Sequence, residues 1–295
     1  MSAGRPTGIA ADGVRADGRE PGESRPAADG VPSAATRHSA TLTVRDFSIR
    51  FLSADREVRA VDAISCDISD GHINAIVGPS GCGKSTLLNA VADLLPPTAQ
   101  LSGELAVRPG VKLGYVFQQD ALLPWRTTLG NAEMGLEIAG IPRSERLQRL
   151  EKWLRITGLT DFADHYPHQL SGGMRQRVSL IRTLVCEPHL VLMDEPFGAL
   201  DAQTRAVMQD EVLRIWRETR TTILLVTHDL AEAILLARRV FVMSRQPGRV
   251  IRVVDVELAE PRDVFETRVT PQFEALYKEV WQVLRDQFRS QAGNP

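Results

Sequence analysis

A glycine-rich segment between an apolar run and a helical stretch has the residue types that hold phosphate groups. It reads Gly78, Pro79, Ser80, Gly81, Cys82, Gly83, Lys84, Ser85 and Thr86, and it lies between Ile73–Val77 and a helix expected over 85–95. These residues match the P-loop pattern, in which backbone N–H groups and a helix N-terminus surround an anion. Lys84 adds a mobile positive charge, Ser85 supplies a hydroxyl for Mg²⁺, and Thr86 is expected to reach the α-phosphate. The segment predicts a nucleotide site.

Cys82 stands at a variable position of this pattern. A helix N-terminus lowers the pKa of a nearby thiol, so one interpretation is a redox switch. The interpretation that we favour is a small tolerated residue, whose modification would block the nucleotide by its bulk.

A second segment places two carboxylates at the end of an apolar run. Leu190–Met193 is typical of a buried strand, and Asp194 and Glu195 follow it directly. Carboxylates in such a place are costly to desolvate unless something uses them. Beside a phosphate loop, Asp194 is placed to hold Mg²⁺ through water and Glu195 to polarise an attacking water as general base. The alternative, a strand capped by an acidic turn, is disfavoured by the upstream loop.

A third segment, Leu170-Ser171-Gly172-Gly173, opens a helix. Ser171 can cap that helix, and the two glycines bring bare backbone N–H groups and the helix dipole close to an anion. This is a second phosphate-binding helix N-terminus. The alternative is a simple cap before the amphipathic helix expected over Met174–Val185.

Together these segments resemble the motifs of ATP-binding cassette (ABC) ATPases, over about residues 42–258. In that family the run at Ser171, Gly172 and Gly173 is the signature motif, which binds the γ-phosphate of a nucleotide held by a second copy of the domain. The resemblance therefore implies that two chains enclose two ATP molecules head to tail.

Three further residues match other motifs of the family. Gln118, after Tyr115-Val116-Phe117, matches the Q-loop glutamine; Asp201, in Ala199-Leu200-Asp201, matches the D-loop at the dimer seam; and His228 matches the switch histidine that contacts the γ-phosphate. The family implies a catalytic set of Glu195, His228, Gln118 and Lys84. It implies Mg²⁺ ligation by Ser85, Gln118 and Asp194.

The family also stacks adenine on an aromatic residue near the end of the first strand. Phe51 is the nearby candidate, although the hairpin over Leu52–Val58 is longer than usual. An ordinary core phenylalanine is the alternative.

Four short segments resemble the nitrate/sulfonate/taurine import subfamily of ABC transporters. They are Leu122-Leu123-Pro124-Trp125-Arg126-Thr127, Pro196-Phe197-Gly198-Ala199-Leu200-Asp201, Arg245-Gln246-Pro247-Gly248-Arg249 and Pro261-Arg262. The resemblance implies the ATPase subunit of a bacterial importer, peripheral on the cytoplasmic face of the inner membrane. Its implied partners are a membrane permease and, indirectly, a solute-binding protein. Leu122–Trp125 either line the groove that receives the permease or belong to the core of the helical part.

Composition excludes some partners and leaves two other function classes to weigh. The net charge of -2 provides no basic field of the kind that holds nucleic acid. An ABC ATPase acting on nucleic acid or ribosomes would be expected to have coiled-coil insertions, tandem cassettes or a basic surface, and a P-loop kinase or GTPase would lack the signature and His228. The three cysteines indicate neither a disulfide framework nor a zinc site. No apolar run reaches the roughly 20 residues that span a bilayer.

The elements that must position these residues follow from the hydrophobic pattern. Strand-like runs recur at Ile73–Val77, Leu190–Met193, Thr222–Val226 and Val240–Met243, each of the last three after a helical segment. This alternation predicts an α/β fold with a mainly parallel sheet, and the family adds an antiparallel β subdomain and an inserted helical subdomain.

The predicted organisation has three parts. Residues 1–39, rich in Gly, Pro, Ala, Asp and Arg, are expected to be a disordered tail. Residues 40–262 form the ATP-binding domain, with the helical subdomain at about 118–170. Residues 263–295 contain an amphipathic helix, in which Phe273, Tyr277, Val280, Leu284 and Phe288 are expected to form one apolar face.

Overall fold

The computed structural model describes residues 40–53, 56–198 and 200–289. The predicted N-terminal tail, residues 1–39, lies outside the described residues.

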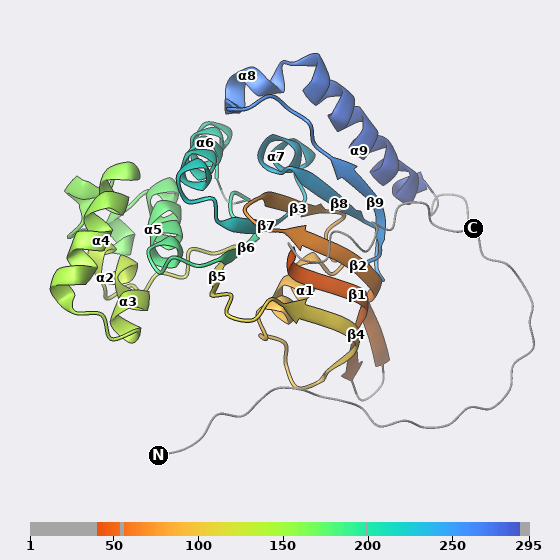
Figure 1. Ribbon diagram of the computed structural model, residues 1–295, viewed down its shortest axis with the longest axis horizontal. Helices are drawn as coiled ribbons and strands as arrows, with labels where there is room; N and C mark the ends of the chain where they lie inside the picture. Colours follow the sequence, from red (N-terminus) through yellow and green to blue (C-terminus); the bar gives the residue numbers. More distant parts are fainter. Residues whose placement is uncertain (1–39, 54–55, 199, 290–295) are drawn as a thin grey trace, which may run out of the picture. The chain divides into compact units, whose positions relative to one another are not determined.

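The centre of the described chain is a six-stranded sheet in the order β5-β6-β7-β3-β8-β9 (Figure 1). The strands are β3 Ile73–Val77, β5 Leu113–Val116, β6 Leu190–Asp194, β7 Thr222–Thr227, β8 Arg239–Met243 and β9 Val250–Asp255. All neighbours are parallel except β8 and β9. The β3 and β7 residues are buried throughout, as expected for parallel strands covered on both faces. The carboxyl ends of β5, β6, β7 and β3 therefore meet at one edge.

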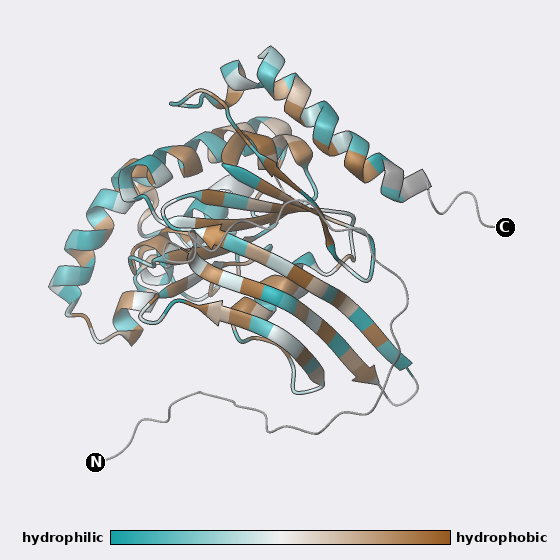
Figure 2. Cartoon of the chain, turned by 45° about the vertical axis from the view of Figure 1, so that its right-hand side comes forward, coloured by the Kyte–Doolittle hydropathy of each residue, from teal (hydrophilic) through white to brown (hydrophobic). Residues whose placement is uncertain are grey.

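A second, antiparallel sheet in the order β2-β1-β4 packs against this core. Its strands are β1 Ala40–Ser53, β2 Arg56–Ser69 and β4 Ala99–Val107. Figure 2 shows apolar and polar residues alternating along these strands, so one face is turned to the core. Leu87 and Leu88 of helix α1, Lys84–Val91, share an apolar cluster with residues of both sheets.

Helix α1 is shorter than the sequence predicted, because the chain turns before Leu95. Asp93 adopts φ +56°, a left-handed conformation that ends a helix and that glycine adopts most easily.

The segment after β5 folds into helices at one side of the central sheet (Figure 1). They are α2 Thr128–Ala132, α3 Met134–Ile138, α4 Arg143–Ile156 and α5 Gly172–Leu184, with short 3₁₀ turns at Thr160–Phe162 and Pro167–Gln169. Glu133 separates the two short helices α2 and α3. The buried Asn131 bonds the backbone of Leu123, Arg126 and Thr127 and so anchors the preceding loop.

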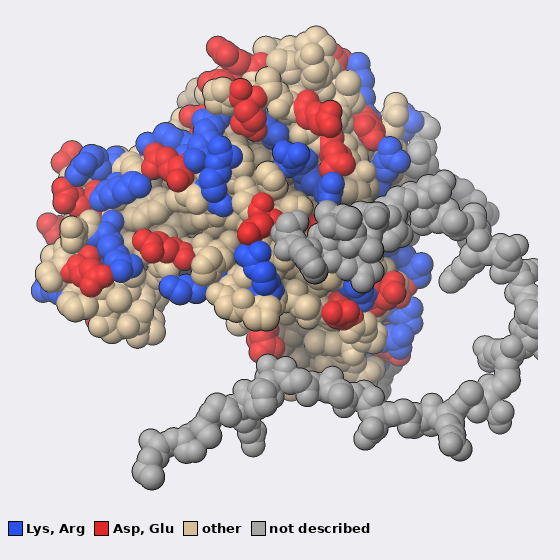
Figure 3. All heavy atoms as spheres, viewed as in Figure 1, with Lys and Arg blue, Asp and Glu red and all other residues tan. Residues whose placement is uncertain are grey.

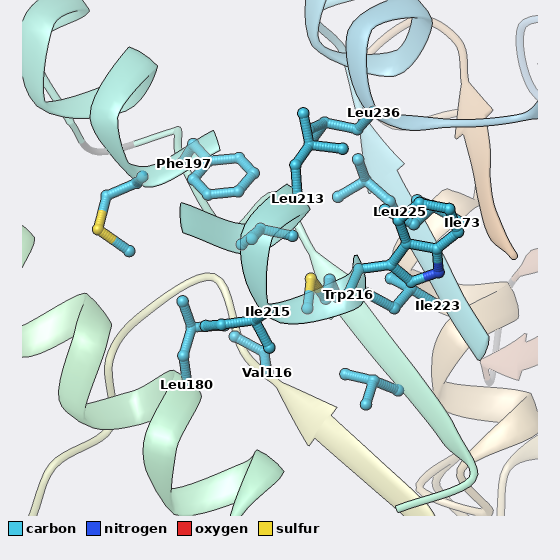
Figure 4. Packing of buried hydrophobic residues seen from close by; sticks show 14 of the residues in the cluster. Ile73, Val116, Leu180, Phe197, Leu213, Ile215, Trp216, Ile223, Leu225 and Leu236 are labelled. Carbon is cyan, nitrogen blue, oxygen red and sulfur yellow. The ribbon is translucent and has the colours of Figure 1, made fainter. Parts of the chain in front are cut away.

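The remaining helices are α6 Ala202–Thr219, α7 Leu230–Leu236, α8 Val264–Arg268 and α9 Pro271–Arg289. Figure 4 shows side chains of α5, α6 and α7 meeting those of the central strands in one core; Trp216 lies beside Ile73 and Ile223. The buried face of α9 includes fewer residues than the sequence predicts. Phe273, Val280 and Leu284 are buried, Tyr277 is 38% exposed, and the side chain of Phe288 lies outside the description.

Within the residues that the structure describes, none of the helices combines the length and apolar character needed to cross a bilayer.

Candidate ATP hydrolysis site

The glycine-rich loop forms a curled turn between β3 and α1. Gly81 and Gly83 have φ of +76° and +105°, and a Cβ on Gly83 would lie 2.6 Å from the carbonyl oxygen of Ala60. The Nζ of Lys84 donates to the carbonyl oxygens of Gly78 and Pro79 at 2.9 and 3.1 Å. The two carbonyl oxygens thus hold the ammonium group inside the loop. In the P-loop pattern this ammonium group binds phosphate oxygens instead.

Ser85 and Asp194 connect the phosphate loop to the end of β6. The hydroxyl of Ser85 donates to Oδ1 of Asp194 at 2.8 Å. Burial raises the pKa of Asp194 and neighbouring Glu195 raises it further, while the Ser85 bond lowers it. Burial therefore disfavours negative charge at this carboxylate, and a cation beside it would offset that effect. A hydroxyl and a carboxylate oxygen are ligands that Mg²⁺ accepts.

Magnesium at this position would depend on few protein ligands. Among the described residues no cluster of three or more His, Cys, Asp or Glu side chains is placed to hold a metal. Mg²⁺ commonly uses one or two carboxylates together with water and substrate phosphates, so Ser85 and Asp194 fit that pattern.

Glu195 is the point where three strand ends converge. Its Oε2 lies 3.1 Å from Nδ1 of His228, which follows β7, and 3.4 Å from Nε2 of Gln118, which follows β5. Its own φ is +44°, and its N–H donates to the carbonyl oxygen of Val226. A left-handed glutamate is strained, and such strain is common at functional sites. The structure thus brings Gln118, Glu195 and His228 together, although the sequence could only place each one at the end of a strand.

Ser171 caps α5, as the sequence predicts. Its hydroxyl accepts from the backbone N–H of Met174 at 3.3 Å. Gly172 is exposed, and a Cβ there would find its nearest neighbour at 3.9 Å. Gly173 is different, because a Cβ would lie 2.6 Å from Cγ2 of Thr204 on α6. Gly173 is therefore also needed for helix packing.

Asp201 caps α6 by accepting from the backbone N–H groups of Gln203 and Thr204 at 3.1 and 3.0 Å. Arg205 then donates to the carbonyl oxygen of Leu200 and pairs with Asp229, next to His228. This contact connects the two loops that carry Asp201 and His228. Sequence reasoning missed Arg205, because nothing local marks a mid-helix arginine as a connector.

Glu232 is a second group that the sequence did not single out. It is buried on α7, and burial followed by repulsion from Asp229 raises its pKa to about 8. The charge of Arg205 and a hydrogen bond with Thr227 lower the pKa of Glu232, whereas the charge of Glu195 raises it further. The available signal was a single acid in the apolar run Leu230–Leu236.

Replacing Glu232 by glutamine is expected to stabilise the protein at alkaline pH. The folded-state pKa is raised above the ordinary value of 4.5, so ionisation opposes folding: the free energy of unfolding falls between about pH 4.5 and 8 and stays low above that range. The thermal midpoint of Glu232→Gln should exceed that of the wild type at pH 9 and approach it at pH 5. A difference independent of pH would contradict this account; Glu151→Gln, on the exposed face of α4, is the matched control.

Cys82 and Phe51 both contact the apolar cluster that the two sheets share. Cys82 is buried, and burial raises the pKa of its thiol, which opposes a redox role. Phe51 is half-buried on β1, paired with Val58 and Ala99, and it packs against the apolar cluster of the two sheets. Stacking on adenine stays a prediction.

The turn after β8 contacts the back of the phosphate loop, which sequence reasoning did not foresee. Gly248 donates to the carbonyl oxygen of Ala60 at 3.0 Å and accepts from the N–H of Asp62 at 2.9 Å. Arg249 pairs with Asp62. A Cβ on Gly248 would overlap the carbonyl oxygen of Cys82. The subfamily-like run Arg245–Arg249 therefore supports the loop.

Two apolar features lie near the helices that follow Gln118. Trp125 is 71% exposed, whereas Leu122 packs against the main core. A separate cavity of about 420 Å³ opens between β5, α3 and α5, lined among others by Leu136, Ile141 and Cys186. None of Leu122–Trp125 lines this cavity.

Comparison with known proteins identifies the family. The model of the ABC transporter family matches residues 61–198. A taurine import ATP-binding protein, TauB, of Rhizobium johnstonii is 44% identical over 236 residues, covering 78% of this chain and 90% of that protein. The chain belongs to the ABC transporter ATPase family. An uncharacterised ABC transporter ATP-binding protein of Methanocaldococcus jannaschii is 42% identical over 254 residues, covering 85% of this chain and 94% of the relative.

Solved ABC structures agree with the fold. A dimeric bacterial ABC transporter cassette has a TM-score of 0.64 at 30% identity, covering 74% of this chain and all of the other. An ATP-binding cassette in a post-hydrolysis state with ADP and Pi matches equally well. The predicted fold class, ATPase activity and likeness to the nitrate/sulfonate/taurine group of ABC ATPases are confirmed. The chain is an ABC ATPase that binds ATP.

Proposed function

We propose that this chain hydrolyses ATP to drive import of taurine, another small sulfonate, nitrate or a related small solute through a separate membrane permease. The observation that carries the proposal is the convergence of Gln118 and His228 on the carboxylate of Glu195, beside the Ser85–Asp194 pair. Relatives named as taurine import ATP-binding proteins align over most of their length and support the solute class.

The proposed chemistry follows from these positions. Lys84 exchanges the carbonyls of Gly78 and Pro79 for phosphate oxygens, and the N–H groups of the loop hold the same phosphates. Ser85, Asp194 and Gln118 hold Mg²⁺, which when bound neutralises charge on the phosphates. Glu195 orients the attacking water and accepts its proton. His228 shares the Glu195 oxygen in this structure and is placed to contact the γ-phosphate.

A second copy of the chain completes the proposed site. Ser171 and Gly172 present the N-terminus of α5 to an anion, with Gly172 exposed and Gly173 packed on Thr204. We infer that their ligand is the γ-phosphate bound by the partner copy. The dimeric cassette of similar fold supports this arrangement.

Replacing Gly172 by aspartate tests the partner copy. The position has room for a side chain, and a carboxylate at a helix N-terminus favours the isolated helix, but it repels a phosphate brought by another chain. ATP binding by the monomer should change by less than about twofold, while ATP-dependent dimerisation and hydrolysis should fall by about tenfold or more. Sedimentation and steady-state ATPase assays measure these quantities. Gly172→Asn is the uncharged control, and equal loss of monomer binding would refute the assignment to a second copy.

The permease is proposed to dock near Trp125 and the cavity between β5, α3 and α5. An exposed tryptophan and a partly apolar hollow are features of protein interfaces. The chain would then work as a peripheral subunit at the cytoplasmic face of the inner membrane.

The alternative, an ABC ATPase that acts on nucleic acid or ribosomes, has less support. On the face drawn in Figure 3, basic and acidic groups are interspersed rather than gathered into one basic field. The net charge of -2 agrees.

Reconstitution with a permease tests which solute is transported and whether the chain is an importer subunit. The chain is combined in liposomes with a candidate permease and solute-binding protein, and ATP hydrolysis is measured with taurine, an alkanesulfonate or nitrate. Stimulation by one of these solutes is expected. Failure to associate with the permease, together with co-sedimentation with ribosomes, would overturn the importer assignment.

A further inference from the structure

A second cavity, of about 360 Å³, lies at the edge of the central sheet opposite the ATP site. Its walls include His72 just before β3, Arg238 and Arg239 at the start of β8, and Arg220 after α6. The phosphate loop follows the other end of β3, which is five residues long. At about 3.3 Å per residue, the two sites are separated by roughly 16 Å of strand. We call this hollow the arginine cavity.

The arginine cavity contains more cationic than anionic groups. Four arginines, Arg220, Arg238, Arg239 and Arg262, line it together with three carboxylates, Asp255, Glu257 and Glu260. Asp255 pairs with Arg239 at 2.7 Å, and Glu260 lies 3.0 Å from Nε of Arg262. Within the described part of the chain, neither Arg220 nor Arg238 has a carboxylate partner, and Glu257 has no ion pair. The excess is therefore one positive charge, and two guanidinium groups are available.

Arg262 is the buried arginine of the cavity wall, and its contacts are within the chain. Arg262 is 5% exposed, and its Nη1 donates to the carbonyl oxygens of Leu235 and Ala237 at 3.1 and 2.7 Å. Its Nε is buried and faces Glu260, whose Oε1 lies 3.0 Å away in an ion pair. Arg262 is therefore held by the chain itself, which leaves Arg220 and Arg238 as the cavity's uncompensated guanidinium groups.

Burial and the positive charge of the arginine cavity lower the pKa of His72, one of its wall residues. The pKa of His72 is lowered, first by burial and then by the positive charges of Arg238, Arg220 and Arg239; Asp70 has a small opposing effect. Three arginines from two separate segments thus direct positive potential at one imidazole. Arg220 is held in place by its stack on the Trp216 ring, with 4.7 Å between its guanidinium carbon and the ring centroid.

We propose that the arginine cavity binds a small sulfate or sulfonate group on the guanidinium groups of Arg220 and Arg238. Planar guanidinium groups present paired donors that suit tetrahedral oxyanions. The volume is at the lower end of the range for small-molecule sites and leaves room for a free ion or a short organic sulfonate.

Calorimetric titration of the full chain tests this proposal. The protein is held with excess ATP and EDTA, so that the phosphate loop is occupied and hydrolysis does not proceed. Sodium sulfate and taurine are titrated separately, with sodium chloride at matched ionic strength as the blank. Binding of one sulfate, or of one taurine, per chain is expected; the first result alone identifies an inorganic ligand, and the second an organic sulfonate. Absence of binding for both overturns the proposal.

Variants separate the cavity from the phosphate loop. Arg220→Ala and Arg238→Ala change exposed side chains and should each weaken binding by about tenfold. Arg252→Ala, on β9 and paired with Glu279 outside the cavity, is the matched control and should bind as the wild type. If Lys84→Ala abolishes binding while Arg238→Ala leaves it unchanged, the ligand is in the phosphate loop and the proposal fails.

The wild-type protein provides a second readout. An anion beside His72 favours the imidazolium form, so saturating ligand should raise the pKa of His72 in an NMR titration. His72→Gln assigns the signal. A pKa that does not move at saturation overturns the proposal, whatever the arginine variants show.

Discussion

Replacing Glu195 by glutamine is expected to lower the rate of ATP hydrolysis by roughly 10²- to 10⁴-fold, the usual contribution of a general base. The amide keeps the size of the side chain and can still contact His228 and Gln118, but it cannot accept a proton from water. ATP affinity should remain within about threefold, because Lys84 and the loop are unchanged.

Single-turnover ATPase assays measure the chemical step of this variant, and equilibrium binding of a fluorescent ATP analogue measures affinity. Glu151→Gln, with the same chemical change on the exposed face of α4, should behave as the wild type. A Glu195→Gln enzyme with near-normal hydrolysis would exclude Glu195 as the base. The unusual φ of Glu195 would then need another explanation.

Replacing Gly248 by alanine is expected to damage the ATP site from behind. The new methyl group would overlap the carbonyl oxygen of Cys82 and the Cε of Met243, so the turn or the phosphate loop must move. The turn is held by two backbone hydrogen bonds to Ala60 and Asp62, which leaves it little freedom to retreat. We expect ATP affinity to fall by about tenfold or more, and the free energy of unfolding to fall by about 1–3 kcal/mol.

Thermal unfolding with and without ATP separates these two effects. Gly130→Ala is the control, because a Cβ in α2 would meet its nearest neighbours at an ordinary 3.4 Å. If Gly248→Ala lowers the thermal midpoint equally with and without ATP, the turn supports the fold and not the nucleotide site. An unchanged affinity would show that the loop tolerates the displacement.

Local sequence patterns were enough to predict the parts of this protein that depend on neighbouring residues. Glycines with a following Lys-Ser produce a phosphate loop at the end of an apolar strand, and a serine before two glycines caps a helix. These patterns were enough to predict Lys84 inside the loop and Ser171 as the α5 cap, and their order predicted the family.

Contacts between residues far apart in the chain depend on how the strands and helices pack, and no local pattern predicts them. Parallel pairing of β5, β6 and β7 brings Gln118, Glu195 and His228 to one edge, a consequence of strand order that no local pattern contains. Gly248 against Cys82 and the grouping of Arg220, Arg238 and Arg262 were unforeseen for the same reason.

Even local patterns failed where tertiary packing changes the outcome. Cys82 has the helix N-terminus that lowers a thiol pKa, yet burial prevails and raises it. Tyr277 keeps the helical spacing of its neighbours, yet remains partly exposed. Backbone geometry and capping are set by short-range sterics and hydrogen bonds. Burial, and the electrostatics that follow from it, depend on which distant segments pack together.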